Sequence, residues 1–133
     1  MSRLIARVSE IQNSKNINIV KFKLESQTLS MISLDINEEV YVGRKVTLLV
    51  NSSHVSIAKN YNGDLSCTNQ IKAKIVTLKD GELLTHITLA FGESTIDSII
   101  TKESSSSMKL AKGDSVNILI NASELSICEI LND

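Results

Sequence analysis

The sequence has no proline, no tryptophan, and only two tyrosines and two phenylalanines among 133 residues. With so few aromatic rings, the chain lacks the stacking surfaces by which OB-type proteins bind single-stranded nucleic acids. The formal net charge is −1, without the basic excess that a nucleic-acid or anionic-membrane surface requires. We therefore expect no nucleic acid partner and no membrane partner. The net charge does not exclude a small local site for an anion.

Long hydrophobic runs are absent too. No window approaches the roughly 20 apolar residues of a membrane span, and the N-terminus lacks the pattern of a signal peptide. The expected compartment is the cytoplasm. The two cysteines, Cys67 and Cys128, are therefore expected to be free and mostly buried thiols, because disulfides are typical of secreted chains.

Patterns typical of catalysis are missing as well. The sequence shows no repeated acid pair, no glycine-rich phosphate loop and no spacing of a nucleophile and its base. His54 and His86 fall at unrelated positions, which gives no metal-site spacing. We expect a protein that is not an enzyme.

What the sequence does contain is an internal repeat. Residues 46–57 and 116–127 lie seventy positions apart and are identical at six of twelve positions. Further counterparts are 4–8 with 71–75, 20–24 with 87–91, and 30–35 with 98–103. The chain therefore consists of two copies of one pattern.

Each copy predicts about five short strands. Apolar and polar residues alternate over 3–11 and 71–78, which is typical of strands with one buried face. Asn51 and Asn121 are expected to end the strongest strands. Five strands in about sixty residues favour a small barrel, because closure removes exposed strand edges. This predicts an all-β fold.

Two segments between strands are less regular. Residues 35–40 are expected to form one helical turn, with Asp35 as its cap. Ser104–Ser107 are expected to form a solvated loop, because serine hydroxyls compete with helical backbone hydrogen bonds.

The repeat also defines the expected domains, which are a first module over 1–59, a polar linker over 60–65 and a second module over 66–133. A unit of about sixty residues is marginally stable alone. We therefore expect the copies, or several chains, to pack together.

Residues 66–75, Ser-Cys-Thr-Asn-Gln-Ile-Lys-Ala-Lys-Ile, resemble the opening motif of the molybdate-binding Mop or TOBE domain family, typically Ser-Ala-Arg-Asn-Gln-Leu-Lys-Gly-Lys-Val. Residues 31–35 and 99–104 resemble the family's middle segment, and 121–126 its closing Lys-Ala-Ser segment. The resemblance implies two tandem five-stranded OB-like (Mop/TOBE) barrels, as in a di-Mop molbindin. It also implies a homotrimer that holds oxyanions at module interfaces.

The resemblance implies oxyanion-binding residues in three segments of each copy. In the second copy they are Ser66, Cys67, Thr68, Asn69, Thr101, Asn121, Ala122 and Ser123, and in the first copy Ser2, Ser33, Asn51, Ser52 and Ser53. A tetrahedral dianion needs converging N–H and hydroxyl donors, which strand ends and turns supply.

The charged donors of the family motif are missing. Thr68 stands in place of the family's Arg, and Asn51 and Asn121 stand in place of its Lys. Charge-assisted hydrogen bonds are about twice as strong as neutral ones, so the departure bears on affinity. Lys72, Lys74, Arg3 and Arg7 are nearby in sequence, but strand alternation is expected to point them into solvent.

The same residues also have purely structural explanations. Asn51 and Asn121 are suited to turns, Ser53 and Ser123 to local capping, and Ser66, Thr68 and Asn69 to a loop. The expected function is binding of molybdate or tungstate for storage or homeostasis, with no organic cofactor. The alternative is a Mop-like regulatory or assembly module that has lost oxyanion binding and acts through protein contacts.

Overall fold

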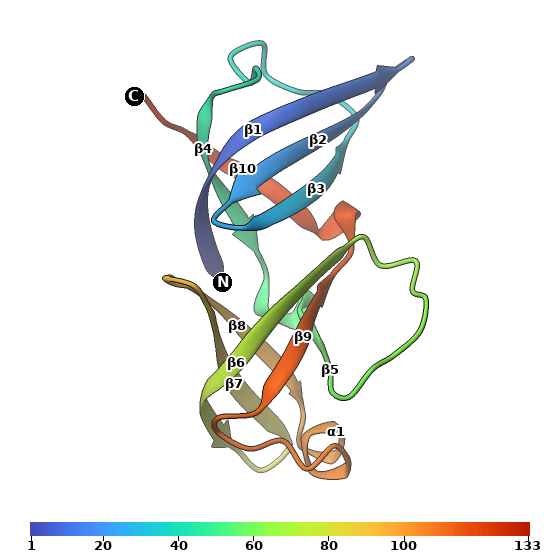
Figure 1. The fold of residues 1–133 in the computed structure, drawn as a ribbon, viewed down its shortest axis with the longest axis vertical. Coiled ribbons are helices and arrows are strands. Elements are labelled where there is room, and N and C mark those ends of the chain that lie inside the picture. The colour runs from blue at the N-terminus through green and yellow to red at the C-terminus, as the bar shows by residue number, and fades with distance from the viewer.

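The computed structural model describes all residues from 1 to 133, and nearly all of its regular structure is β-strand (Figure 1). In chain order the elements are β1 (Ser2–Ser14), β2 (Ile17–Leu24), β3 (Gln27–Ser33), β4 (Lys45–Val50), η1 (Ser52–His54), β5 (Ser56–Ala58), β6 (Asn69–Asp80), β7 (Leu84–Phe91), β8 (Ser94–Thr101), α1 (Lys102–Ser107), β9 (Ser115–Ile120), η2 (Ala122–Glu124) and β10 (Leu125–Ile130). Here η1 and η2 are single 3₁₀ turns. The all-β prediction is confirmed.

The strands form two antiparallel sheets, in the orders β10-β4-β1-β2-β3 and β5-β9-β6-β7-β8. We call the first sheet, with its connections, the first barrel, and the second sheet the second barrel. They are stacked along the long axis of the molecule in Figure 1. The prediction of two tandem five-stranded OB-like units is confirmed.

The two copies exchange their closing strands. β10, from the second copy, pairs with β4 of the first barrel, and β5, from the first copy, pairs with β9 of the second barrel. The expected modules, 1–59 and 66–133, follow the repeat in the sequence, whereas the sheets divide the chain differently. Neither sheet is built from one copy alone.

The predicted alternation places the core. Leu4, Ala6 and Val8 of β1 are buried, whereas Ile5 and Arg7 point outward. The buried faces of both sheets join into one cluster of 24 buried apolar residues that runs through both barrels. Burial of apolar surface is the main stabilising term in folding, so this shared core ties the barrels together.

The repeat is also visible in a matched bulge. Register shifts occur between Val8 and Glu10 in β1 and between Ile75 and Thr77 in β6. Next to each bulge, a glycine with positive φ donates its N–H back to the strand, Gly43 to Val8 and Gly113 to Ile75, both at 2.8 Å. With φ near +95° (+96° and +93°), these turns need glycine because side chains disfavour that region.

A helical turn was expected in the first copy, but the helix is found in the second copy. Residues 35–40 make no helix, whereas Lys102–Ser107 form α1, so the loop expected at Ser104–Ser107 is wrong. Thr101 Oγ1 accepts a hydrogen bond from Ser104 N at 3.1 Å and caps the helix. At the other end, the Lys59 ammonium donates to the carbonyls of Met108 and Lys109. These terminal partners offset the weak helix propensity of serine.

The remaining expectations concern segments outside the sheets. Residues 59–68, which include the expected linker, have no helix or strand. Both cysteines are free, but only Cys67 is partly buried, and Cys128 is exposed, so the expected burial of Cys128 is wrong. Cys128 lies at a register shift of β10, between Ile127 and Glu129, where the alternation of buried and exposed side chains is interrupted. No helix is long and apolar enough to cross a membrane.

Candidate functional site

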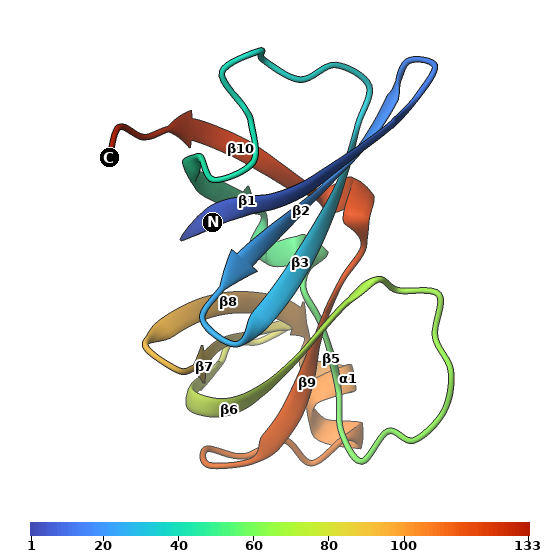
Figure 2. The same ribbon diagram turned by 45° about the horizontal axis from the view of Figure 1, so that its top comes forward.

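The candidate residues gather where the two barrels meet. Each 3₁₀ turn packs against the third strand of the other copy, η2 against β3 and η1 against β8. We call these four elements, with the first residues of β1 and β6, the barrel interface. Figure 2 shows β3 and β8 on either side of it. The interface is therefore built by both copies on each side.

Asn69 joins the barrels through a pair of buried hydrogen bonds. Its side-chain Oδ1 accepts from Ser30 N at 2.7 Å, and its Nδ2 donates to Ser30 O at 2.9 Å. The residue is 1% exposed. The amide therefore acts like a strand neighbour for β3, and both its polar atoms are already satisfied. Asn69 is placed to position the interface, since both polar atoms of its side chain already have a partner across it.

Ser2 occupies the matching position in the first copy. Its Oγ accepts a hydrogen bond from Asp97 N at 2.8 Å. Asp97 pairs with Thr88 as Ser30 pairs with Lys21, so in the folded hairpins Asp97 matches Ser30, one residue before the position that the sequence alignment gives. The two contacts are thus related by the repeat. A hydroxyl accepts at one backbone group where the amide satisfies two, so the two sides of the interface are unequal.

The middle segments lie with the opposite copy. Ser33, at the end of β3, and Ser123, in η2, line one hollow of about 560 Å³ between β3, the 35–40 segment and β10. Ser33 Oγ donates to Asp35 O at 2.6 Å. Because η2 packs on β3 and η1 on β8, each candidate group contains segments from both copies. Thr101, by contrast, caps α1 and pairs with Leu84 at the outer end of the second sheet.

The two asparagines after the strongest strands differ in their contacts. Asn51 Oδ1 accepts hydrogen bonds from Ser53 N at 3.1 Å and from Ser53 Oγ at 3.0 Å. Asn121 begins the matching turn with no side-chain capping bond. In the buried part of each turn, Ser52 and Ala122 are 5% and 7% exposed. The capping explanation therefore fits Asn51, whereas the Asn121 amide stays uncommitted.

The opening motif, which follows the linker, lies beside Asn121. Ser66 and Thr68 are exposed just before β6. The chain is held there by Gln70 Nε2, which donates to Cys67 O at 2.8 Å, and by pairing of Asn69 with Ile120 next to Asn121. Partial burial raises the pKa of the Cys67 thiol, so Cys67 is suited to packing and not to reactivity.

A contact between a histidine and a glutamate at the interface was missed by the sequence analysis. His54 Nδ1 lies 3.0 Å from Glu124 Oε2. The two residues are seventy positions apart, which is the offset of the repeat over 46–57, so aligned positions contact each other across the interface. That alignment was the signal that could have identified the pair.

None of the candidate residues is a lysine or an arginine. Lys72 and Lys74 point outward as expected, and they line a hollow of about 700 Å³ between the linker and the outer face of the second barrel. None of the candidate residues lines that hollow. Nor do any three His, Cys, Asp or Glu side chains gather as metal ligands. The interface therefore offers hydroxyl, amide and backbone groups, and it also contains the carboxylates of Glu124 and, in the hollow with Ser33 and Ser123, of Asp35 and Glu129.

Comparisons with known proteins agree with this arrangement. No curated protein matches the sequence significantly. The fold is similar to a crystal structure described as the cytoplasmic molybdate-binding protein ModG with molybdate bound, with a TM-score of 0.83, 23% sequence identity, and coverage of 94% of this chain and 93% of that one. Residues 65–127 match the TOBE domain family. The likeness to this family therefore lies in the second copy, which the matched residues cover almost completely.

Proposed function

We propose that this chain binds a tetrahedral oxyanion, molybdate or tungstate, at the barrel interface and stores it or buffers its concentration in the cytoplasm. The observation that carries the proposal is the likeness, over almost the whole chain, to a fold that has been crystallised with molybdate. The TOBE match over residues 65–127 adds support from the sequence. The chain acts as a binding module and not as an enzyme.

The proposed donors are hydroxyls and backbone N–H groups. Ser123 lies in one hollow with Ser33, whose hydroxyl donates to Asp35 O when no anion is bound, and Asn121 beside them has no capping bond. Ser66 and Thr68 are exposed at the start of the neighbouring strand. In the first copy, Ser53 follows Asn51 in the matching turn. A dianion has no protons to donate, so it requires several such donors at once.

Assembly supplies what the isolated chain lacks. We propose a homotrimer in which neighbouring chains close the interface around the anion and exclude water from it. A drier site strengthens each hydrogen bond to a charged ligand. This compensates in part for the Thr and Asn residues that stand where the family motif has Arg and Lys.

Equilibrium dialysis with molybdate, tungstate and sulfate tests the proposal. We expect molybdate and tungstate to bind with similar affinity, and Ser123→Ala to weaken both. Ser107→Ala, on the exposed face of α1, is the matched control and is expected to bind normally. Absence of binding by all three anions at high micromolar concentration would contradict the proposal.

A second candidate function is favoured by Asn69. Both polar atoms of its amide are bonded to Ser30, and none of the candidate residues is a lysine or an arginine. These facts suit an assembly or regulatory module that no longer binds oxyanions. The two functions are separated by measuring the mass in solution with and without molybdate. A stable oligomer with no bound anion and no response to molybdate supports the second function.

A further inference from the structure

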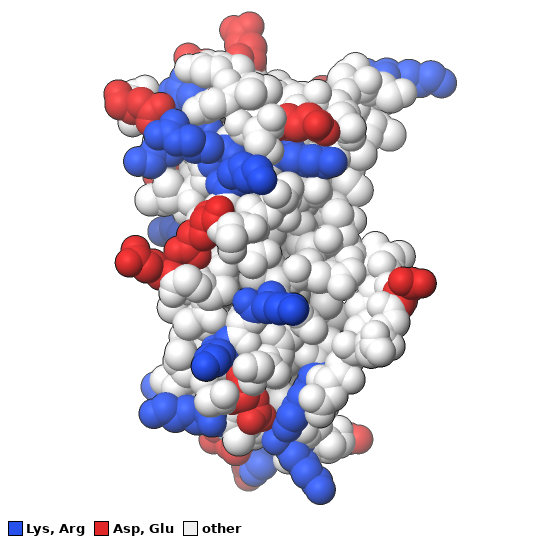
Figure 3. All heavy atoms as spheres, viewed as in Figure 1, with Lys and Arg blue, Asp and Glu red and all other residues white.

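Three cations lie side by side on the outer face of the first barrel. Arg7 of β1 is opposite Lys23 of β2 on one side and opposite Lys45 of β4 on the other. Side chains in register across strands point to the same face. We call Lys23, Arg7 and Lys45 the cationic row. Figure 3 shows Lys and Arg side chains gathered on the upper barrel, with acidic side chains beside them.

Such a row is unfavourable without a counter-charge. Like charges directly opposite one another destabilise a sheet. The neighbouring acids are already engaged elsewhere, because Glu10 pairs with Lys21 and Glu129 contacts Thr47. The matching positions of the second barrel place Lys74 between Ala90 and Ser115, so no row exists there. The first barrel alone concentrates positive charge on this face.

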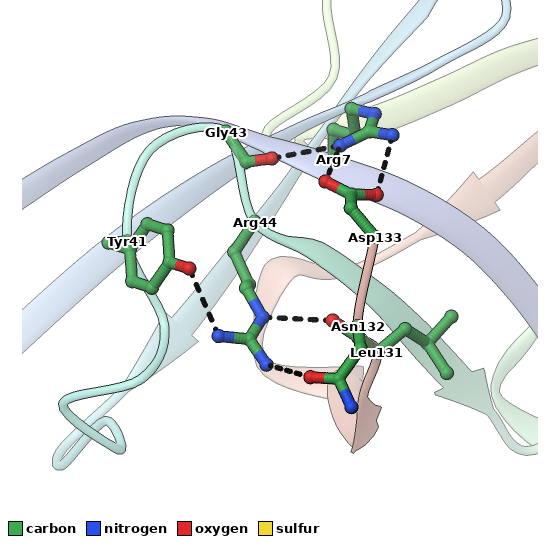
Figure 4. Close-up of polar contacts among 7 residues, drawn as sticks. All are labelled: Arg7, Tyr41, Gly43, Arg44, Leu131, Asn132 and Asp133. Atoms are coloured by element: carbon green, nitrogen blue, oxygen red, sulfur yellow. Dashed lines mark hydrogen bonds and ion pairs between the residues drawn. The ribbon is translucent and has the colours of Figure 1, made fainter.

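An anion already occupies the row. The Arg7 guanidinium donates to both carboxylate oxygens of Asp133, Nη1 to Oδ2 and Nη2 to Oδ1, each at 2.8 Å (Figure 4). Arg7 Nη1 also donates to Gly43 O at 3.0 Å, which fixes the direction of the fork. Two parallel hydrogen bonds to one anion are the geometry by which Arg recognises carboxylates and phosphates.

Arg44 frames the same site from the loop. Its Nε donates to Leu131 O at 2.9 Å, its Nη2 to Asn132 Oδ1 at 3.2 Å and its Nη1 to the Tyr41 hydroxyl at 3.0 Å. The Asp133 pKa is lowered by the hydrogen bond and charge of Arg7, and further by the charges of Lys45 and Arg44. The site therefore favours a negative charge from several directions.

We propose that the cationic row, framed by Arg44, is a binding site for a tetrahedral oxyanion such as phosphate, sulfate or molybdate, and that the Asp133 carboxylate occupies it as an intramolecular competitor. The Arg7 and Asp133 side chains are 52% and 57% exposed. Exposed ion pairs are weak, so a dianion in solution displaces this carboxylate at a modest cost. The site is separate from the barrel interface and does not depend on the function proposed there.

Titration with inorganic phosphate, followed by amide NMR signals and calorimetry, tests the proposal. We expect phosphate to shift the signals of Arg7, Lys23 and Lys45 and to bind Asp133→Asn more tightly, by up to about fivefold, the range set by one exposed ion pair. Arg7→Gln and Lys45→Gln should both weaken binding. Lys74→Gln is the matched control and should leave binding unchanged.

Two results would overturn the proposal. One is the absence of any shift at these residues at tens of millimolar phosphate, and the other is equal affinity in the wild type and Asp133→Asn. Molybdate binding at the barrel interface is followed separately through the signals of Ser33, Asn121 and Ser123. Failure of one site is therefore distinguishable from failure of the other.

Discussion

The two barrels have the same buried strand framework but differ in their closing strands and in the segments that follow them. Both have the same strand pairings, the same bulge and a matched glycine turn. In the first barrel the closing strand has six residues and is followed by a tail held by Arg7 and Arg44. In the second barrel it has only three, and Lys59 anchors the chain to the end of α1. The core defines the fold, and the loops and strand ends distinguish the copies.

The strongest test of the comparison is a pair of core truncations. Leu48→Ala and Ile118→Ala remove matched side chains that are both fully buried, one in each barrel. Each should lower the free energy of unfolding by about 2–5 kcal/mol. Because closing strands are exchanged and the core is shared, urea denaturation should show one transition in each variant. Two separate transitions would mean that the barrels unfold independently.

The barrel interface should respond unequally to matched changes. Asn69→Ala leaves the N–H and C=O of Ser30 without partners, so it should cost about 2–4 kcal/mol. Ser2→Ala removes one hydrogen bond to Asp97 N and should cost about 1 kcal/mol. Urea denaturation measures both. Equal losses of unfolding free energy in the two variants would contradict the claim that the two sides of the interface are unequal.

The helix that only the second barrel has depends on its cap. Thr101→Ala removes the hydrogen bond to Ser104 N and should cost about 1 kcal/mol. Ser33→Ala is the control at the aligned position of the sequence repeat, where no helix follows. It removes the hydrogen bond to Asp35 O and should cost about 1 kcal/mol, but it should leave hydrogen exchange over α1 unchanged. Thermal unfolding with hydrogen exchange over α1 gives both values. An unchanged α1 in Thr101→Ala would show that the cap is dispensable.

The smallest effect concerns two exposed carboxylates. Asp133 in the first barrel and Asp114 in the second both have a lowered pKa, owing to hydrogen bonds from Arg7 and Lys59 respectively. A lowered pKa means that each pair stabilises the fold above the unfolded value of about 4, and that this contribution is lost as pH falls further. Asp133→Asn and Asp114→Asn should each flatten the pH dependence of the urea midpoint below about pH 4. Unchanged profiles would contradict these pairs.

The sequence predicts the fold well because the fold depends on local alternation. The alternation of Leu4, Ala6 and Val8 with outward-facing residues predicts a strand whichever distant strand pairs with it. The exchange of β5 and β10 has no such signal, because matching strands of a repeat fit either sheet. The helix α1 was missed because Lys59, more than forty residues away, covers its C-terminal carbonyls.

The candidate site was predictable in part. Ser33 lies with Ser123 of the other copy at the barrel interface, whereas Thr101 caps α1 at the outer end of the second sheet. The contact of His54 with Glu124 depends on how the copies face each other, which no single strand pattern encodes. Whether these segments bind an anion stays a prediction.

The central claim is that an oxyanion lies at the barrel interface, and the most direct measurement is a crystal structure with molybdate, using the anomalous signal of molybdenum. The account predicts a peak within hydrogen-bond distance of Ser123 or of its counterpart Ser53. A peak found only at Arg7 on the outer face, or no peak at saturating molybdate, would contradict it.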